Sequence, residues 1–279
     1  MAELYLLSGA GNDFLAQVDP ATTPEAATVR AWCRRGTSLG ADGFLTLERF
    51  EDGVRLGHWN PDGQRSALCL NGSRCAVQLA CHLGWHVGGR LVLYTDSGPL
   101  VGRRIDARRT SVDLPPVLGE PTPCSLRLDG ETFETWRLRV GVPHLVVPWE
   151  GGLADLPMGR LGPALRAHPD LGPEGANVDF VHFLDTDRFE VRCYERGVEG
   201  ETLACGTGVV AASAVGVATG WLTPPVVAVT AGGFDLGVSG SVADNRLSHV
   251  SLSGDARLLA RLDVTAAAAI TCQPPVWSP

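Results

Sequence analysis

Hydrophobic and polar residues follow two patterns along the chain, and each pattern predicts one kind of element. Short segments with a period of two and many β-branched or aromatic residues predict strands; examples lie at 44–48, 91–94, 138–140 and 189–194. Longer apolar segments with helical start and stop signals predict helices; these lie near 24–35, 71–83, 158–167 and 206–219. The last of these is apolar on every side and built of small residues, so we expect protein to surround it.

The order of these elements predicts an α+β protein with two pseudo-symmetric domains. In each domain we expect a curled antiparallel β-barrel-like sheet that wraps around one central helix. A proline-rich stretch at 113–117 is poor in backbone donors for strand pairing and predicts the boundary. The expected N-terminal domain is 1–114 together with the tail 264–279, and the expected C-terminal domain is 115–263.

The two halves repeat the same landmarks in the same order. Cys69 and Cys205 each open an apolar segment, and a tryptophan follows each cysteine at the same interval, at Trp85 and Trp221. The other matching pairs are Gly11-Asn12-Asp13-Phe14 with Gly141-Val142-Pro143-His144, Gly40-Ala41-Asp42 with Gly175-Ala176-Asn177, Asn60 with Glu195, and Val92–Gly98 with Val227–Gly233. Solenoid repeats have periods of about 20 to 50 residues. A much longer period seen twice indicates two like-folded domains from a duplicated ancestor.

Composition narrows the class of protein. The chain has 279 residues, a hydrophobic fraction of 44% and a net charge of −8. An acidic chain without a basic cluster argues against nucleic acid as a partner. The N-terminus lacks the basic start and apolar core of a signal peptide, and no apolar stretch approaches the ~18 residues of a membrane span. We therefore expect a cytoplasmic protein with no membrane contact and a small molecule as its ligand.

Cysteine spacing and the absence of lysine bear on cofactors. The eight cysteines form no CxxC pair or other zinc-ligand spacing, so we expect no metal site. All 23 Lys and Arg positions are arginine. A pyridoxal enzyme needs a lysine to hold its cofactor as a Schiff base, so that chemistry is excluded. No nucleotide-binding glycine motif is present either, and we expect no cofactor.

Cys69 and Cys205 are the candidate catalytic residues. Each lies on a tight turn just before a helix, where unpaired N–H groups and the helix dipole favour thiolate and bind anions. Such a position can lower a cysteine pKa into the range of about 3.5–7.5. Two such thiols facing one pocket could invert an amino-acid Cα without a cofactor, one as base and the other as acid. The alternative is two buried, inert cysteines at helix starts.

Several motifs, in order along most of the chain, resemble those of the diaminopimelate epimerase family. They are Gly11-Asn12-Asp13-Phe14, Gly40-Ala41-Asp42-Gly43, Asn60-Pro61-Asp62-Gly63, Cys69-x-Asn71-Gly72-x-Arg74-Cys75, Asn177-Val178-Asp179-Phe180, Tyr194-Glu195-Arg196-Gly197 and Ala204-Cys205-Gly206-Thr207-Gly208. The resemblance implies two pseudo-symmetric barrels with central helices and a homodimer. It also implies interconversion of L,L- and meso-2,6-diaminopimelate, a step of lysine and peptidoglycan precursor synthesis.

The resemblance also implies roles for single residues. Cys69 and Cys205 would be the two catalytic bases, and His144 and Glu195 would tune their pKa values. The residues that would contact substrate are Asn12, Asn60, Leu70, Asn71, Asn177, Glu195, Arg196, Gly206 and Thr207. Among these, Asn71, Gly206 and Thr207 would hold the reacting end of the substrate. The distal amino and carboxylate groups would be held by Asn12, Asn60, Asn177 and Arg196.

Two positions depart from the family pattern. Leu70 stands where the family has glycine, and Val142 stands where it has asparagine. Leu70 keeps its backbone N–H, but Val142 cannot hydrogen-bond a distal polar group. Two alternatives therefore stay open: a racemase of another amino acid on the same scaffold, and a non-catalytic amino-acid-binding or thiol-redox protein.

Overall fold

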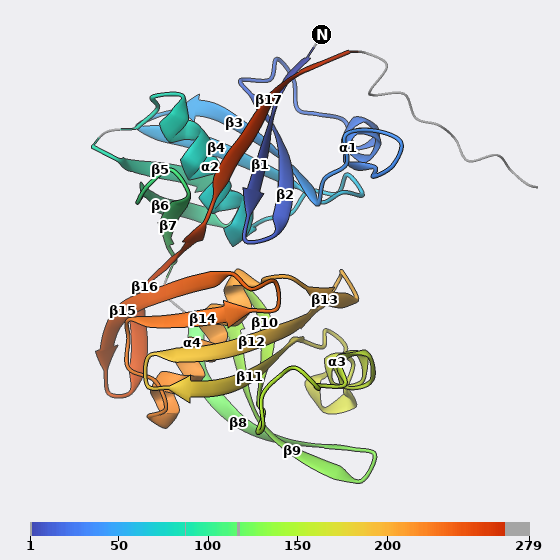
Figure 1. Ribbon diagram of the computed structural model, residues 1–279, viewed down its shortest axis with the longest axis vertical. Helices are drawn as coiled ribbons and strands as arrows, with labels where there is room; N and C mark the ends of the chain where they lie inside the picture. Colours follow the sequence, from blue (N-terminus) through green and yellow to red (C-terminus); the bar gives the residue numbers. More distant parts are fainter. Residues whose placement is uncertain (1, 87, 116–117, 266–279) are drawn as a thin grey trace, which may run out of the picture.

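The computed structural model describes residues 2–86, 88–115 and 118–265, which form two halves of similar design (Figure 1). In each half a curled sheet wraps around one long helix. The elements of the first half are β1 (Ala2–Gly9), β2 (Asn12–Val18), α1 (Ala26–Cys33), β3 (Gly43–Phe50), β4 (Gly53–Trp59), α2 (Leu70–His82), β5 (Arg90–Thr95), β6 (Gly98–Arg104) and β7 (Arg109–Asp113).

The second half begins with β8 (Leu118–Leu128) and ends with β16. Its other elements are β9 (Glu131–Val140), β10 (Val142–Pro148), α3 (Met158–Arg166), the 3-10 turn η1 (Pro169–Leu171), β11 (Asn177–Asp185), β12 (Arg188–Glu195), β13 (Gly200–Thr202), α4 (Gly206–Thr219), β14 (Val226–Thr230), β15 (Asp235–Ala243) and β16 (Arg246–Asp255). A last strand, β17 (Arg257–Val264), returns to the first half (Figure 1).

All four predicted helices and three of the four example strands are present within one or two residues of their predicted ends, while the segment 138–140 is the end of the longer strand β9. The two central helices differ in character. Nearly every residue of α4 from Gly206 to Val217 is buried, as its apolar sequence predicted. In α2 the buried set also includes polar residues, among them Asn71 and Arg74. None of the helices in the described residues is long and apolar enough to cross a membrane.

The sheet is mixed, which corrects the prediction of purely antiparallel pairing. The pairs β2–β3, β4–β5, β10–β11 and β12–β14 are parallel. Each of these pairs is joined by a connection that contains one of the four helices, in the order α1, α2, α3 and α4. Parallel neighbours need such a crossover, and a helix usually supplies it. The same sequence of hairpins and helical crossovers thus occurs twice, as the repeated landmarks predicted.

One strand, β17, follows the second half in sequence but pairs within the first half. After β7 the chain crosses to the second half, where β8 pairs with β9. After β16 the chain crosses back, and β17 pairs with β1 from Ala2↔Val264 to Ser8↔Arg257. Between the crossings, β7 and β16 pair with each other. We keep the division near residues 113–117 as a proposal and move the proposed return to the first half from residue 264 to residue 257. Residues 266–279 of the predicted tail lie outside the described part of the chain.

Candidate active site

Cys69 caps the N-terminus of α2. Its backbone is extended (φ −137°, ψ 113°), and its Sγ accepts a hydrogen bond from the Gly72 N–H at 3.4 Å. A side chain in this position takes up one of the backbone donors that a helix leaves unpaired. The predicted setting of this thiol at a helix start is confirmed.

Cys205 occupies the same position on α4, again with extended backbone (φ −109°, ψ 107°). Its Sγ does not cap the helix through a backbone N–H. Instead it lies 3.4 Å from the Thr207 hydroxyl. The two cysteines therefore share a place in the fold but differ in their hydrogen-bond partners.

The two helix N-termini meet at the junction of the halves. A Cβ placed on Gly206, the first residue of α4, would lie only 3.0 Å from Cβ of Leu70, the first residue of α2. The Asn71 side chain donates to the Ala204 carbonyl at 3.0 Å, directly before Cys205. Leu70 thus packs against the opposite motif, and a side chain at position 206 would crowd it. The repeated motifs, distant in sequence, form one site.

Burial outweighs the helix N-terminus in setting the thiol pKa values. Desolvation raises the pKa of Cys69 to about 11, although the Gly72 N–H lowers it. For Cys205, the neighbouring Cys193 thiol lowers the pKa most, but burial and the nearby carboxylates of Glu195 and Asp179 raise it overall. The expected net lowering by the helix N-terminus is therefore not found, because desolvation disfavours the charged form of both thiols.

Glu195 lies within electrostatic reach of both thiols. It comes from the end of β12, and its Oε1 accepts from the Thr202 hydroxyl at 2.5 Å. Its negative charge raises the pKa of Cys69 and that of Cys205. Burial in turn raises the pKa of Glu195 itself. A carboxyl group with this placement is suited to hold or release a proton beside the thiols.

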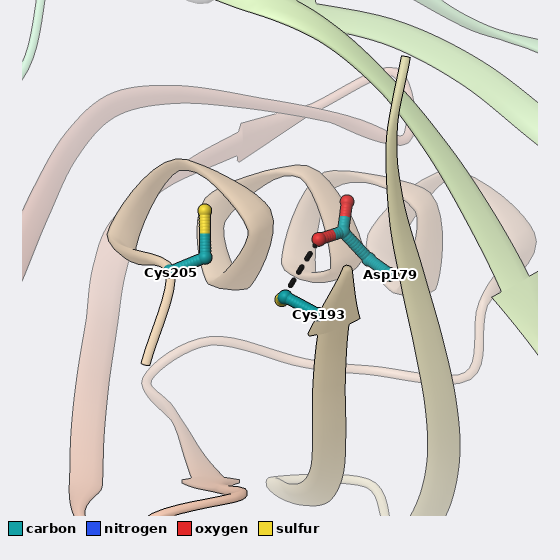
Figure 2. Close-up of side chains that lie close together, drawn as sticks. All are labelled: Asp179, Cys193 and Cys205. Atoms are coloured by element: carbon teal, nitrogen blue, oxygen red, sulfur yellow. Dashed lines mark hydrogen bonds between the residues drawn. The ribbon is translucent and has the colours of Figure 1, made fainter. Parts of the chain in front are cut away.

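Behind Cys205 lies a buried cluster that the sequence did not predict (Figure 2). His144 Nδ1 is 2.7 Å from Asp179 Oδ2, and both side chains are fully buried. The Cys193 thiol donates to the other oxygen, Asp179 Oδ1, at 2.9 Å. Since a carboxylate accepts only, His144 donates from Nδ1. His144 thus contacts Asp179 rather than a catalytic sulfur.

Asp179 and Cys193, together with Cys205, form the one group in the described residues with potential metal-ligand spacing. The ligand atoms of Asp179, Cys193 and Cys205 lie within 4.8 Å of one another. The short Cys193–Asp179 contact is a hydrogen bond, which satisfies the thiol and one carboxylate oxygen. This arrangement is that of a buried polar network, and a metal ion would have to displace it.

The predicted substrate residues of the first half separate into two groups. Asn12 and Asn71 lie together, with the Asn71 Nδ2 donating to Asn12 Oδ1 at 2.6 Å. Asn12 also donates to Asp42 at 3.3 Å. Asn60 is exposed on the turn after β4, and its backbone pairs with Gln64 at 2.8 Å.

In the second half, Asn177 and Arg196 lie together. The Asn177 side chain accepts from the Arg196 backbone N–H at 2.9 Å. The Arg196 guanidinium is paired with Glu174 at 2.9 Å, and Glu174 also pairs with Arg139 at 2.8 Å. The predicted binder of a distal carboxylate therefore already contacts an internal carboxylate. Val142, where β10 begins, is half-buried.

Three further residues belong to the site: Arg74, Asp179 and Cys193. Arg74 is fully buried and donates to Asn71 Oδ1 at 2.7 Å, while its Nε and one terminal nitrogen have no partner in the described residues. The sequence could have indicated Cys193, because it lies two residues before Glu195 on one strand and therefore on the same face of the sheet. Asp179 had the same relation to Asn177.

Comparisons with known proteins agree with this geometry. A family model described as diaminopimelate epimerase matches residues 137–257. A diaminopimelate epimerase of Aquifex aeolicus is 36% identical over 76% of this chain and 80% of its own length. One of Chlorobaculum tepidum is 33% identical over 93% of this chain and 100% of its own.

Solved structures share the fold at low sequence identity. A hydroxyproline epimerase of Agrobacterium vitis aligns with a TM-score of 0.67 and 15% identity, covering 97% of this chain and 95% of its own. A PhzF-family protein of Enterococcus faecalis aligns with a TM-score of 0.68 and 17% identity, covering 93% and 97%. The predicted fold class, two like halves of curled sheet around a helix, is confirmed.

Proposed function

The chain belongs to the diaminopimelate epimerase family, and on that premise we propose that it interconverts L,L- and meso-2,6-diaminopimelate by inverting one Cα without a cofactor. The observation that carries the proposal is the meeting of two helix N-termini, each directly preceded by a cysteine. Leu70 contacts Gly206, and Asn71 donates to the carbonyl that precedes Cys205. Two thiols at one junction are what a base and an acid on opposite faces of a carbon require.

The proposed mechanism assigns the proton steps to the thiols. One sulfur, as thiolate, removes the Cα proton, and the other, as thiol, gives a proton to the opposite face. In the reverse direction the two cysteines exchange roles. Backbone N–H groups of Asn71, Gly72, Gly206 and Thr207 would bind the α-carboxylate, where negative charge grows as the proton leaves.

Both thiols have raised pKa values, so the proposal needs a source of thiolate. Glu195 is the candidate that would take the proton from a thiol, because it is a carboxyl group with a raised pKa in contact with Cys205. A raised pKa makes a carboxylate a stronger base, so proton transfer to it from a thiol costs less. We propose that Glu195 accepts the proton of one thiol when substrate enters, and that His144 acts on it from a distance through its electrostatic interaction.

By the family resemblance, the distal end of the substrate would bind to Arg196, Asn177, Asn12 and Asn60. An arginine fork suits a carboxylate. Because Glu174 now pairs with Arg196, a distal carboxylate would replace one internal ion pair by another. The Arg196–Glu174 pair is partly exposed to solvent, and such pairs contribute little net stability. Val142 offers no hydrogen bond here, so a racemase of another amino acid stays the second candidate.

Solvent deuterium exchange at Cα tests the proposal. The protein is incubated in deuterated buffer with L,L- and meso-diaminopimelate, proline, hydroxyproline and glutamate, and label is followed by mass spectrometry and NMR. We expect exchange and inversion with diaminopimelate alone. Exchange with another amino acid in its place would favour the second candidate, and exchange with none would favour a binding protein or a thiol-redox protein.

We also propose a homodimer in the cytoplasm, as the family resemblance suggests. Light scattering of the purified protein tests the oligomeric state. A monomer at micromolar concentration would contradict this part of the proposal and leave the chemistry untouched.

A further inference from the structure

Cys193 is a third buried thiol beside the reaction centre, and the proposed mechanism gives it no task. Strand pairing explains its position. Asp179 on β11 and Cys193 on β12 are direct partners in an antiparallel ladder, so their side chains lie on the same face of the sheet. That face is turned toward α4, whose N-cap is Cys205. A Cβ on Gly208, in the first turn of α4, would lie 2.2 Å from Asp179 Oδ1 and 2.9 Å from Cys193 Sγ.

The Cys193 thiol has one hydrogen and two possible acceptors. One is Asp179 Oδ1 at 2.9 Å, where the hydrogen points in the structure. The other is Cys205 Sγ, which lies within 4.8 Å of both atoms. Asp179 is itself fixed by His144 on its second oxygen. Figure 2 shows Cys193 between the carboxylate and the sulfur of Cys205.

A buried thiolate needs a hydrogen-bond donor that is available when its negative charge forms. Cys205 is almost completely buried, so water cannot solvate it. The carboxylates of Asp179 and Glu195 oppose a negative charge there, whereas Cys193 favours it. A thiol hydrogen can turn about one C–S bond, which is a smaller change than moving a side chain or admitting water.

We propose that Cys193 is a positioning residue for Cys205, turning its thiol hydrogen to Cys205 Sγ when Cys205 is a thiolate and to Asp179 Oδ1 when Cys205 is a thiol. No proton leaves Cys193 and no covalent bond changes. The Asp179–His144 pair supplies the second acceptor and holds Cys193 in place. The inference rests on the proposed function of Cys205 as a base and acid, but its test does not require a substrate.

The test compares the reactivity of two cysteines in one protein. Wild type, Cys193→Ala and Cys193→Ser are treated with iodoacetamide from pH 6 to 10, and alkylation of Cys205 and Cys69 is followed separately by peptide mass spectrometry. Cys81→Ala is the matched control, since it removes a buried thiol at the far end of α2. Asp179, Glu195 and His144 remain in every variant.

We expect Cys193→Ala to slow alkylation of Cys205 about tenfold at pH 8, as the loss of a hydrogen bond to a charged group predicts. The alkaline rise of the Cys205 profile should move to higher pH, while Cys69 keeps its profile. Serine keeps a donor and should restore most of the rate, and Cys81→Ala should match wild type. If alanine disturbs folding, Cys193→Val fills the space without a donor and should behave like alanine.

Two results would overturn the inference. One is a Cys205 profile in Cys193→Ala or Cys193→Val that equals wild type. The other is Cys193→Ser as slow as Cys193→Ala, because the effect would then come from packing. Failure of the proposed function is distinguishable: wild type would not exchange diaminopimelate Cα hydrogen, yet the Cys205 profile would still depend on the donor at position 193.

Discussion

The surroundings of Cys69 and Cys205 differ more than their sequences do. Beside Cys69 lies a buried cation, Arg74, which favours its thiolate. Behind Cys205 lie a buried carboxylate, Asp179, and a neutral donor, Cys193. Glu195 acts on both sulfurs. The two cysteines thus occupy equivalent positions at helix starts, and unequal neighbours give the two thiols different electrostatic environments.

This difference suits a reaction that needs one thiol and one thiolate at a time. If the two sites were identical, a single proton would be found on either sulfur with equal probability. The cation near Cys69 and the carboxylates near Cys205 favour Cys69 as the thiolate and Cys205 as the thiol. The hydrogen bond from Cys193 would lower the free energy of the opposite arrangement. Burial still dominates both sites, so these neighbours adjust pKa values that are raised to begin with.

Removing either sulfur should have the largest effect. We expect Cys69→Ala and Cys205→Ala each to lower the rate of inversion by about 10²–10⁴-fold, the usual contribution of a general acid or base. Both variants should fold, since only a small side chain is lost. The rate is measured by chromatographic separation of the L,L and meso isomers. A single variant that inverts Cα at the wild-type rate would exclude the two-base mechanism.

The first turn of each central helix offers a matched pair of glycine variants. A Cβ on Gly208 would lie 2.2 Å from Asp179 Oδ1, which His144 holds in place. A Cβ on Gly72 would meet Leu45 Cδ2 at 3.2 Å, the end of a flexible side chain. We expect Gly208→Ala to lower the free energy of unfolding by about 1–3 kcal/mol through overpacking. Gly72→Ala should be neutral, because alanine favours the helix.

Urea unfolding of both variants checks this pair. Equal losses of stability would mean that the two helices tolerate side chains alike, and the proposed difference between the half-sites would not extend to packing.

The pH dependence of Cys69 reactivity follows from its pKa of about 11. Below that pH the thiol keeps its proton, so the reactive thiolate fraction falls about tenfold for each pH unit. Alkylation of Cys69 by iodoacetamide should therefore rise about 100-fold from pH 7 to 9 without levelling. Peptide mass spectrometry gives the rate. A plateau near neutral pH would show that the helix N-terminus prevails over burial.

Arg74 should matter for one thiol only. Methionine has a similar length and no charge, so Arg74→Met should slow alkylation of Cys69 about tenfold at pH 8, as loss of a nearby buried cation predicts. Cys205 in the same protein is the internal control and should not change. Arg74→Lys keeps the charge and should retain most of the rate. Equal slowing of both sulfurs would indicate a general disturbance of the junction.

The smallest effect concerns the substrate rather than the thiols. Val142→Asn restores the residue type that the resemblance associates with this position. We expect KM for diaminopimelate to fall by about 2- to 10-fold, the value of one neutral hydrogen bond, with kcat unchanged. Steady-state kinetics measure both constants. A rise in KM would indicate that Val142 contributes to recognition of a different substrate.

Local patterns predicted much of this molecule, and long-range contacts explain the rest. The helix at 206–219 and the thiol that precedes it were readable because helix caps and apolar runs are local signals. The pairing of Asp179 with Cys193 depends on the register between two strands, which a single sequence does not state. The raised pKa of Cys69 depends on burial in the folded protein, so a helix start alone predicted the wrong direction.

The pairing of β17 with the first half determines when the fold can be completed during synthesis. β1 is synthesised long before its partner β17, because the two strands lie at opposite ends of the described chain. Until then the first half has an open sheet edge, the kind of surface on which other chains pair and aggregate. Pairing between ends so distant in sequence also slows folding. We therefore expect the β1 edge to stay unpaired on one side until β17 arrives, so the sheet of the first half is completed late.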